Sequence, residues 1–82
     1  LDIAISFQAS EQKGIVSEVA GNADILVAPD LDSGNILYKS MVFLSDASSA
    51  AVILGAKVPI VLTSRADSEK NKLYSIALAA II

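Results

Sequence analysis

The stretch VPIVLTSRADSEKNKLYSIALAAII, residues 58–82, joins two patterns that decide the fold. Its first part, VPIVLT (58–63), is an apolar and partly β-branched run, which is typical of a buried strand. AAVILG (50–55) lies just before it across a tight connection, which predicts antiparallel pairing of two strands. From about Asp67 to the end the pattern becomes that of an amphipathic helix, with apolar residues at helical spacing: Leu73, Ile76, Ala77, Ala80 and Ile81.

The upstream half of the chain predicts a further strand between two helices. Residues 2–13 have a partly helical pattern that Gly14 would close as the residue after the helix. ILVA (25–28) is a short apolar run that predicts a buried, parallel strand, after a solvated loop. A second helix is predicted from Gly34 to about Leu44. The order of helix, strand, helix, two strands and helix indicates an α/β domain with helices on both faces of a sheet.

The composition indicates that this chain buries its apolar faces against something outside it. Of its 82 residues, 54% are hydrophobic and 18% are charged. An ordinary globular domain has about 25% charged residues. Because a small domain needs a largely polar surface, we expect the chain to pack against the rest of a longer protein or against another copy of itself.

Charge and residue usage exclude several classes of function. The net charge is −3 and aromatic residues make up 5%, so nucleic acid binding is not expected. The chain has no cysteine and no histidine, which excludes disulfides, thiolate or imidazole catalysis and Cys/His zinc sites from within it. No apolar stretch is long enough to predict a membrane span, and the start does not resemble a signal peptide. We therefore expect a cytoplasmic location.

TSRADS, residues 63–68, has two interpretations. Ser64 and Asp67 have the spacing of a capping box for the following helix, and Asp67 or Ser68 could also cap it alone. Alternatively, the helix N-terminus, the Arg65 guanidinium and the Ser64 hydroxyl form an anion site. The two interpretations are compatible, because a ligand can itself cap a helix.

PDLDSGNILYK, residues 29–39, is the second polar segment that follows a predicted strand. Asp30 and Asp32 are typical turn formers and are too few for a metal cage, so no metal site is predicted. Asn35 and Lys39 lie four residues apart and could reach a phosphate or a carbonyl group.

Two long stretches of the chain resemble the sequences of a known enzyme family. KGIVSEVAGNADILVAPDLDSGNILYKSMVF and LGAKVPIVLTSRADSEKNKLYSIALA resemble the C-terminal part of the phosphate acetyl/butyryl transferases, most of all the phosphate butyryltransferase branch. The resemblance implies a three-layer α/β/α fold like that of isocitrate/isopropylmalate dehydrogenases. Residues 1–82 would be a single partial domain of it, lacking the N-terminal domain of the same chain. It also implies a homo-oligomer, and a reaction between acyl-CoA and inorganic phosphate that gives acyl phosphate and free coenzyme A. The family needs no metal and no cofactor beyond coenzyme A as substrate.

The resemblance assigns roles to five residues. It implies transition-state stabilisation by Ser64 and phosphate binding by Arg65, with substrate-binding positions at Thr63, Asn35 and Lys39. One position of the chain, seven residues after Ser64, departs from the pattern of the family. Related acetyl enzymes have an aspartate there, which is proposed to deprotonate the coenzyme A thiol.

In this chain that position is Asn71, which cannot act as a base. Deprotonation by another route, a substitute base at Asp67 or Glu69, and an impaired enzyme all stay open. A Ser64 nucleophile is disfavoured, because no histidine can activate it.

Two other functions compete with acyl transfer. A dehydrogenase of the same broad fold would need a nicotinamide, and the chain has no G-x-G-x-x-G fingerprint. A non-catalytic module would use the amphipathic helices for oligomerisation only. On the acyltransferase interpretation, we expect residues 1–82 alone to be inactive, because the site needs a second wall.

Overall fold

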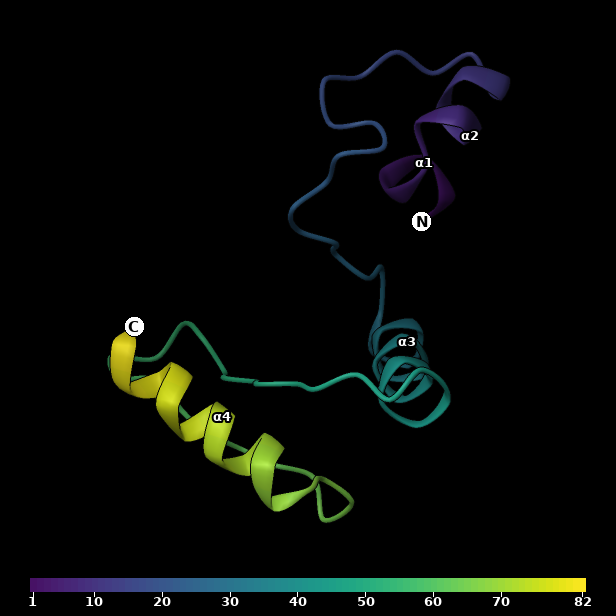
Figure 1. The fold of residues 1–82 in the computed structure, drawn as a ribbon. Helices are drawn as coiled ribbons and strands as arrows, with labels where there is room; N and C mark the ends of the chain where they lie inside the picture. The colour runs from purple at the N-terminus through teal and green to yellow at the C-terminus, as the bar shows by residue number, and fades with distance from the viewer. The chain divides into compact units, whose positions relative to one another are not determined.

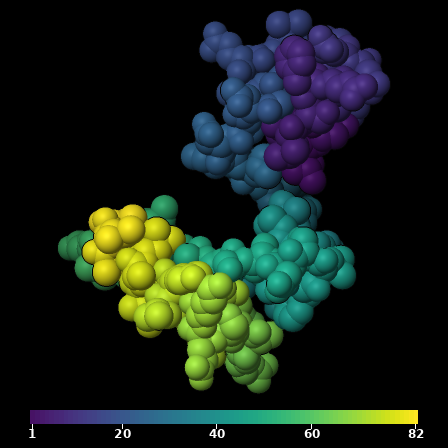
Figure 2. Space-filling model, viewed as in Figure 1, coloured from purple at the N-terminus to yellow at the C-terminus, as the bar shows by residue number.

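A computed structural model describes residues 1–82 as four helices, of which the first two are separated by a single residue and the others by long irregular segments (Figure 1). In chain order these are α1 (Asp2–Ile5), α2 (Phe7–Gln12), α3 (Leu31–Leu44) and α4 (Glu69–Ile81). The chain divides into two compact units, Leu1–Asn35 and Ile36–Ile82. The C-terminal turn of α4, yellow in Figure 2, stands at the molecular surface.

The first unit begins with the helix predicted for residues 2–13, which is broken once. Ser6 takes an extended conformation, with φ −118° and ψ 114°, and its hydroxyl accepts a hydrogen bond from the Ala9 N–H at 3.2 Å. Ser6 therefore ends α1 and caps α2, which is a usual role for serine. Gly14 follows the helix with φ +66°, as predicted.

The segment from Ser17 to Ala23 is exposed in most of its residues, as predicted for a solvated loop, but it is anchored to α1. The Gly21 N–H donates to the Ile3 carbonyl at 2.8 Å, and the Ala23 N–H donates to the Ala4 carbonyl at 3.3 Å. Ala20 is the one buried apolar residue of the chain. The prediction of a solvated loop missed this anchoring, because glycine and alanine carry no sequence signal for it.

Substitution of Gly21 by alanine is expected to destabilise the protein more than the same substitution at Gly14. Both glycines have positive φ, at +72° and +66°, so both variants carry backbone strain of about 1 kcal/mol. Only at Gly21 would the new Cβ lie 2.5 Å from the Phe7 nitrogen, whereas nothing lies within 4 Å at Gly14. Overpacking adds about 1–3 kcal/mol. Urea unfolding of both variants in the full-length protein measures the difference, and equal midpoints would contradict the close packing of this loop.

The buried strand predicted at residues 25–28 is wrong for this structure. No backbone hydrogen bond of the chain involves residues 24–29, and Val27 is 88% exposed. A strand exists only where neighbouring backbone groups pair with it, and residues 1–82 supply no such neighbour here.

The antiparallel pairing predicted for 50–55 and 58–63 is confirmed at one position. Ile53 and Ile60 form an isolated antiparallel bridge, with N–H···O distances of 2.8 and 3.3 Å. Gly55 supports the turn between them with φ +105°. The two full-length strands of the prediction are not formed.

Helix α3 begins three residues before the predicted start at Gly34. The Asp30 carboxylate accepts a hydrogen bond from the Ser33 N–H at 2.7 Å, and its carbonyl accepts from the Gly34 N–H at 3.2 Å. Asp30 thus caps the first turn, and residues 31–33, which the sequence placed before the helix, are helical.

The apolar surface of the chain is largely uncovered. On α4, Leu73 is 62% exposed and Ile76 is 58% exposed. This agrees with the expectation from composition that the chain buries its apolar faces against something outside residues 1–82. No helix combines the length and the apolar character that crossing a membrane requires.

Candidate functional site

The segment 63–68 leads directly into α4, and its last residue caps that helix. The Ser68 hydroxyl accepts a hydrogen bond from the Asn71 N–H at 3.1 Å. Ser68 was one of the two single residues predicted to cap the helix alone. The capping box with Ser64 as its first residue is wrong, because Ser64 lies too far before Glu69, where the helix begins.

Ser64 and Asp67 close a tight turn of their own. The Ser64 N–H donates to Asp67 Oδ2 at 2.8 Å, and the Asp67 N–H donates to the Ser64 carbonyl at 3.1 Å. Ser64 Oγ accepts from the Ala66 N–H at 3.2 Å, and its own O–H donates to no group of the chain. The turn leaves Arg65 exposed at its tip. Two consecutive residues before the start of a helix therefore carry a free hydroxyl donor and a free guanidinium.

The second oxygen of Asp67 binds α3. Asp67 Oδ1 accepts a hydrogen bond from the Tyr38 hydroxyl, and the two residues lie 29 positions apart in the chain. This bond, followed by the one from the Ser64 N–H, lowers the pKa of Asp67, and the charges of Lys39 and Lys72 lower it further. The same bond raises the pKa of Tyr38, which therefore stays a proton donor.

Asp67 is poorly suited to act as a base. Both of its oxygens accept hydrogen bonds, and its lowered pKa keeps it ionised and weakly basic at neutral pH. The bonds of ionised Asp67 stabilise the folded state at every pH above the usual pKa of an aspartate. This stabilisation is lost as the pH falls through the lowered pKa of Asp67. Of the two substitute bases that the sequence left open, the geometry thus disfavours Asp67.

Lys39 lies beside this hydrogen-bond pair. Its ammonium group is 5.9 Å from the centroid of the Tyr38 ring and 5.7 Å from that of Phe43. Stacking of this kind holds a lysine over aromatic faces. The structure thus brings Lys39 near the carboxylate that binds the Ser64 backbone, through a Tyr38–Asp67 bond that the sequence analysis did not predict.

The other two predicted positions are less closely tied to this arrangement. Thr63 is half-buried and immediately precedes the turn. Asn35 is exposed on α3, one helical turn before Lys39, and is the last residue of the first unit.

Asn71 has a structural position in this chain. The residue is 6% exposed, and its Oδ1 accepts a hydrogen bond from the Ser49 N–H at 3.1 Å. One turn later, Ser75 Oγ accepts from the Ala51 N–H at 2.9 Å and donates to the Asn71 carbonyl at 3.0 Å. The buried face of α4 is therefore polar and binds the backbone of residues 49–51.

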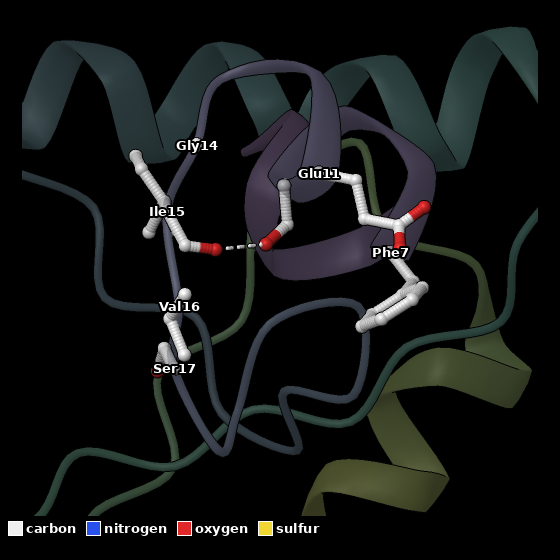
Figure 3. A pocket seen from close by; sticks show the side chains of 7 residues that line it. Phe7, Glu11, Gly14, Ile15, Val16 and Ser17 are labelled. Carbon is white, nitrogen blue, oxygen red and sulfur yellow. Dashed lines mark hydrogen bonds between the residues drawn. The ribbon is translucent and has the colours of Figure 1, made fainter.

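Cavities lie in separate parts of the chain, and two of them are the largest described. One of about 310 Å³ opens beside the N-terminus of α4, and its lining includes Phe43, Ser48, Ala66, Ser68 and Asn71. The other, of about 400 Å³, lies in the first unit among residues 7–17 (Figure 3). There the Ser10 hydroxyl donates to the Ile15 carbonyl at 2.6 Å. Only the first cavity adjoins the turn that carries the predicted site residues.

Comparison with known sequences decides the family. The family described as phosphate acetyl/butaryl transferase matches residues 1–80. The chain belongs to this family. It is 62% identical over 81 residues to a phosphate acetyltransferase of Thermotoga maritima, covering 99% of this chain and 28% of the relative. It is 65% identical over 79 residues to a probable phosphate butyryltransferase of Bacillus subtilis, covering 96% of this chain and 26% of the relative.

A solved structure supports the same grouping. The chain matches a crystal structure of a branched-chain phosphotransacylase from Enterococcus faecalis V583 with a TM-score of 0.82 and 45% identity. The match covers 98% of this chain and 30% of that one. Residues 1–82 thus have the fold of one part of a phosphotransacylase, and the chain spans between 26% and 28% of the length of the two curated relatives.

Proposed function

We propose that residues 1–82 are part of a phosphate acyltransferase that moves an acyl group between coenzyme A and inorganic phosphate. A phosphate oxygen attacks the thioester carbonyl carbon, the carbon–sulfur bond breaks, and coenzyme A leaves as the thiolate. Acyl phosphate is the other product, and the reaction is reversible. The observation that carries the proposal is the turn at 63–68 in a member of this family, where Arg65 is exposed and the Ser64 hydroxyl has no acceptor within the chain.

The chemistry suits these two residues. Attack by phosphate on the thioester of coenzyme A brings two anions together, and a guanidinium offsets their repulsion while fixing the phosphate oxygens. The Ser64 O–H is a donor for the oxyanion of the tetrahedral intermediate. In the proposal Lys39, Asn35 and Thr63 bind substrate, and no metal or cofactor takes part.

The reverse reaction does not require a protein base that deprotonates the coenzyme A thiol completely. A thiol with a pKa of about 8.5 is already partly ionised at neutral pH. Thiolate attack on acyl phosphate can therefore proceed without a carboxylate at position 71. The Asn71 side chain there accepts a hydrogen bond from the Ser49 N–H. If a base does assist, Glu69 in the first turn of α4 is the candidate, because it is the carboxylate nearest to position 71 in the sequence that accepts no hydrogen bond from the chain.

The rest of the proposal concerns what lies outside residues 1–82. We place the second wall of the cleft in an N-terminal domain of the same chain, in a three-layer α/β/α fold of the isocitrate dehydrogenase type. The exposed apolar face of α4 supports packing of this kind. Butyryl is the proposed acyl group, although relatives with acetyl and butyryl names are about equally similar. Homo-oligomerisation and a cytoplasmic location stay predictions.

The direct test is release of coenzyme A by the full-length protein that contains this chain. Butyryl-CoA and acetyl-CoA are each supplied with and without inorganic phosphate, and free thiol is measured. The proposal expects release only with phosphate, and faster release from butyryl-CoA. Folded protein that shows no dependence on phosphate would refute acyl transfer, and faster release from acetyl-CoA would correct the acyl group.

The isolated 82-residue chain is expected to show no phosphate-dependent release. It buries a single apolar residue, Ala20, so burial supplies little to offset the conformational entropy of folding. The measurement uses the purified chain beside the full-length protein at equal molarity, with circular dichroism to follow folding. Activity of the chain alone would show that it holds a complete site.

The exposed face of α4 also favours the non-catalytic alternative, a module that serves assembly only. Leu73 and Ile76 would then be the residues that matter. Substituting them would break assembly, whereas Ser64→Ala and Arg65→Ala would leave every activity of the full-length protein intact.

A further inference from the structure

We propose that Tyr38 and Asp67 form the positioning pair of the Ser64–Arg65 turn, with the Tyr38 hydroxyl fixing the turn to α3. The inference rests on the proposed function of that turn. Neither residue needs to touch substrate, because the pair acts through the backbone of Ser64.

The hydrogen bonds of the turn carry the argument. Three of them are internal, joining Ser64 to Ala66 and to Asp67. The bond from the Tyr38 hydroxyl to Asp67 Oδ1 is the single hydrogen bond that joins residues 61–67 to another part of the chain. Without it the turn keeps its internal shape but loses its polar connection to α3. A shift of about 1 Å in a catalytic group can cost on the order of a hundredfold in rate.

The two side chains have the properties that this role requires. An ionised carboxylate only accepts, and Asp67 uses one oxygen for the Ser64 N–H and the other for Tyr38. The Tyr38 ring is rigid and lies beside the ammonium group of the next residue, Lys39. Two consecutive residues of α3, Tyr38 and Lys39, therefore place a hydroxyl donor and an ammonium charge near the Asp67 carboxylate.

Other roles for Asp67 fit less well. Ser68 already caps α4, so Asp67 is not needed for that purpose. Both oxygens of Asp67 are occupied, so it is not free to take a proton from a thiol. Positioning is the role that accounts for both bonds.

The test compares Tyr38→Phe with Tyr74→Phe in the full-length protein. Tyr74 is the other tyrosine of the chain, and its hydroxyl makes no hydrogen bond within it. Tyr38→Phe is expected to lower kcat by about tenfold, which is the range for loss of a hydrogen bond to a charged group. KM for acyl-CoA should change little, and Tyr74→Phe should leave both parameters unchanged.

A double-mutant cycle separates positioning from general destabilisation. Asp67→Ala removes both bonds, so adding Tyr38→Phe to it should lower kcat no further. Asp67→Asn keeps an oxygen for the Ser64 N–H and an amide that can donate to Tyr38, and it should recover part of the rate. Losses of kcat that add up in the double variant would overturn the proposal. So would a loss of rate that disappears once the rate is divided by the concentration of folded protein.

Amide hydrogen exchange reports the same geometry without relying on activity. Peptides covering residues 63–68 are expected to exchange faster in Tyr38→Phe than in Tyr74→Phe or the unsubstituted protein. If the unsubstituted protein shows no phosphate-dependent release, the proposed function fails, and exchange alone decides the anchoring role. Equal exchange in the two tyrosine variants would then overturn it.

Discussion

Arg65→Ala in the full-length protein is expected to lower kcat/KM for phosphate by about a hundredfold, the scale for removing one partner of a charged, hydrogen-bonded pair. The reason is that Arg65 is exposed at the tip of its turn and offers a planar fork that fits phosphate oxygens. Initial rates at varied phosphate and saturating acyl-CoA measure the effect. KM for phosphate should rise more than KM for acyl-CoA.

Two further variants make this prediction specific. Arg65→Lys keeps the charge but loses the fork, so it should recover only part of kcat/KM. Lys57→Ala removes an equal charge from the exposed connection between residues 55 and 58 and serves as the matched control. An equal loss in Lys57→Ala would mean that net charge, and not phosphate binding at Arg65, sets the rate.

Ser64→Ala is expected to lower kcat by about a hundredfold, the range for loss of one donor to an oxyanion. The Ser64 O–H donates to no group of the chain and is available to a substrate oxygen. KM for phosphate should change little, because Arg65 is intact. Steady-state kinetics of the full-length variant give both parameters.

The control for Ser64 addresses its local bond. Its hydroxyl oxygen accepts from the Ala66 N–H, so the substitution also weakens the turn. Ser64→Thr retains a hydroxyl and should retain most of the rate. Equal losses for alanine and threonine, or a loss matched by a lower melting temperature, would assign Ser64 to the turn and not to the reaction.

The helices of this chain could be predicted from sequence because their signals are local. Apolar spacing placed α4 within a few residues of Glu69–Ile81, and Gly14 has the positive φ expected after a helix. The start of α3 was missed by three residues, because the aspartate at position 30 was interpreted as a turn former. It is in fact the residue that caps the helix.

Of the predicted strands, only the pairing at Ile53 and Ile60 is formed within the chain. An apolar run such as 25–28 has the composition of a strand, but pairing depends on backbone groups elsewhere. Residues 1–82 give such a partner only to Ile53 and Ile60. The apolar runs therefore remain exposed in a chain that spans about a quarter of its relatives.

The candidate site was predicted in part. TSRADS was identified by its residue types, and the turn that it forms leaves its hydroxyl and guanidinium available. Tyr38 was missed, although it lies within the quoted segment 29–39. Its partner is 29 residues away, and no spacing rule connects a tyrosine on one helix to an aspartate before another. The roles of Ser64, Arg65, Thr63, Asn35 and Lys39 stay predictions.

Trapping of the acyl product tests the central claim most directly. The full-length protein is incubated with butyryl-CoA and inorganic phosphate, and hydroxylamine converts any acyl phosphate to a hydroxamate that can be quantified beside free coenzyme A. Because hydroxylamine also reacts slowly with the thioester itself, both products are counted above a control without protein. Acyl transfer to phosphate predicts equal excesses of hydroxamate and coenzyme A, and no excess of either when phosphate is left out. An excess of coenzyme A with free butyrate and no excess of hydroxamate would contradict it, because the enzyme would then be a thioester hydrolase.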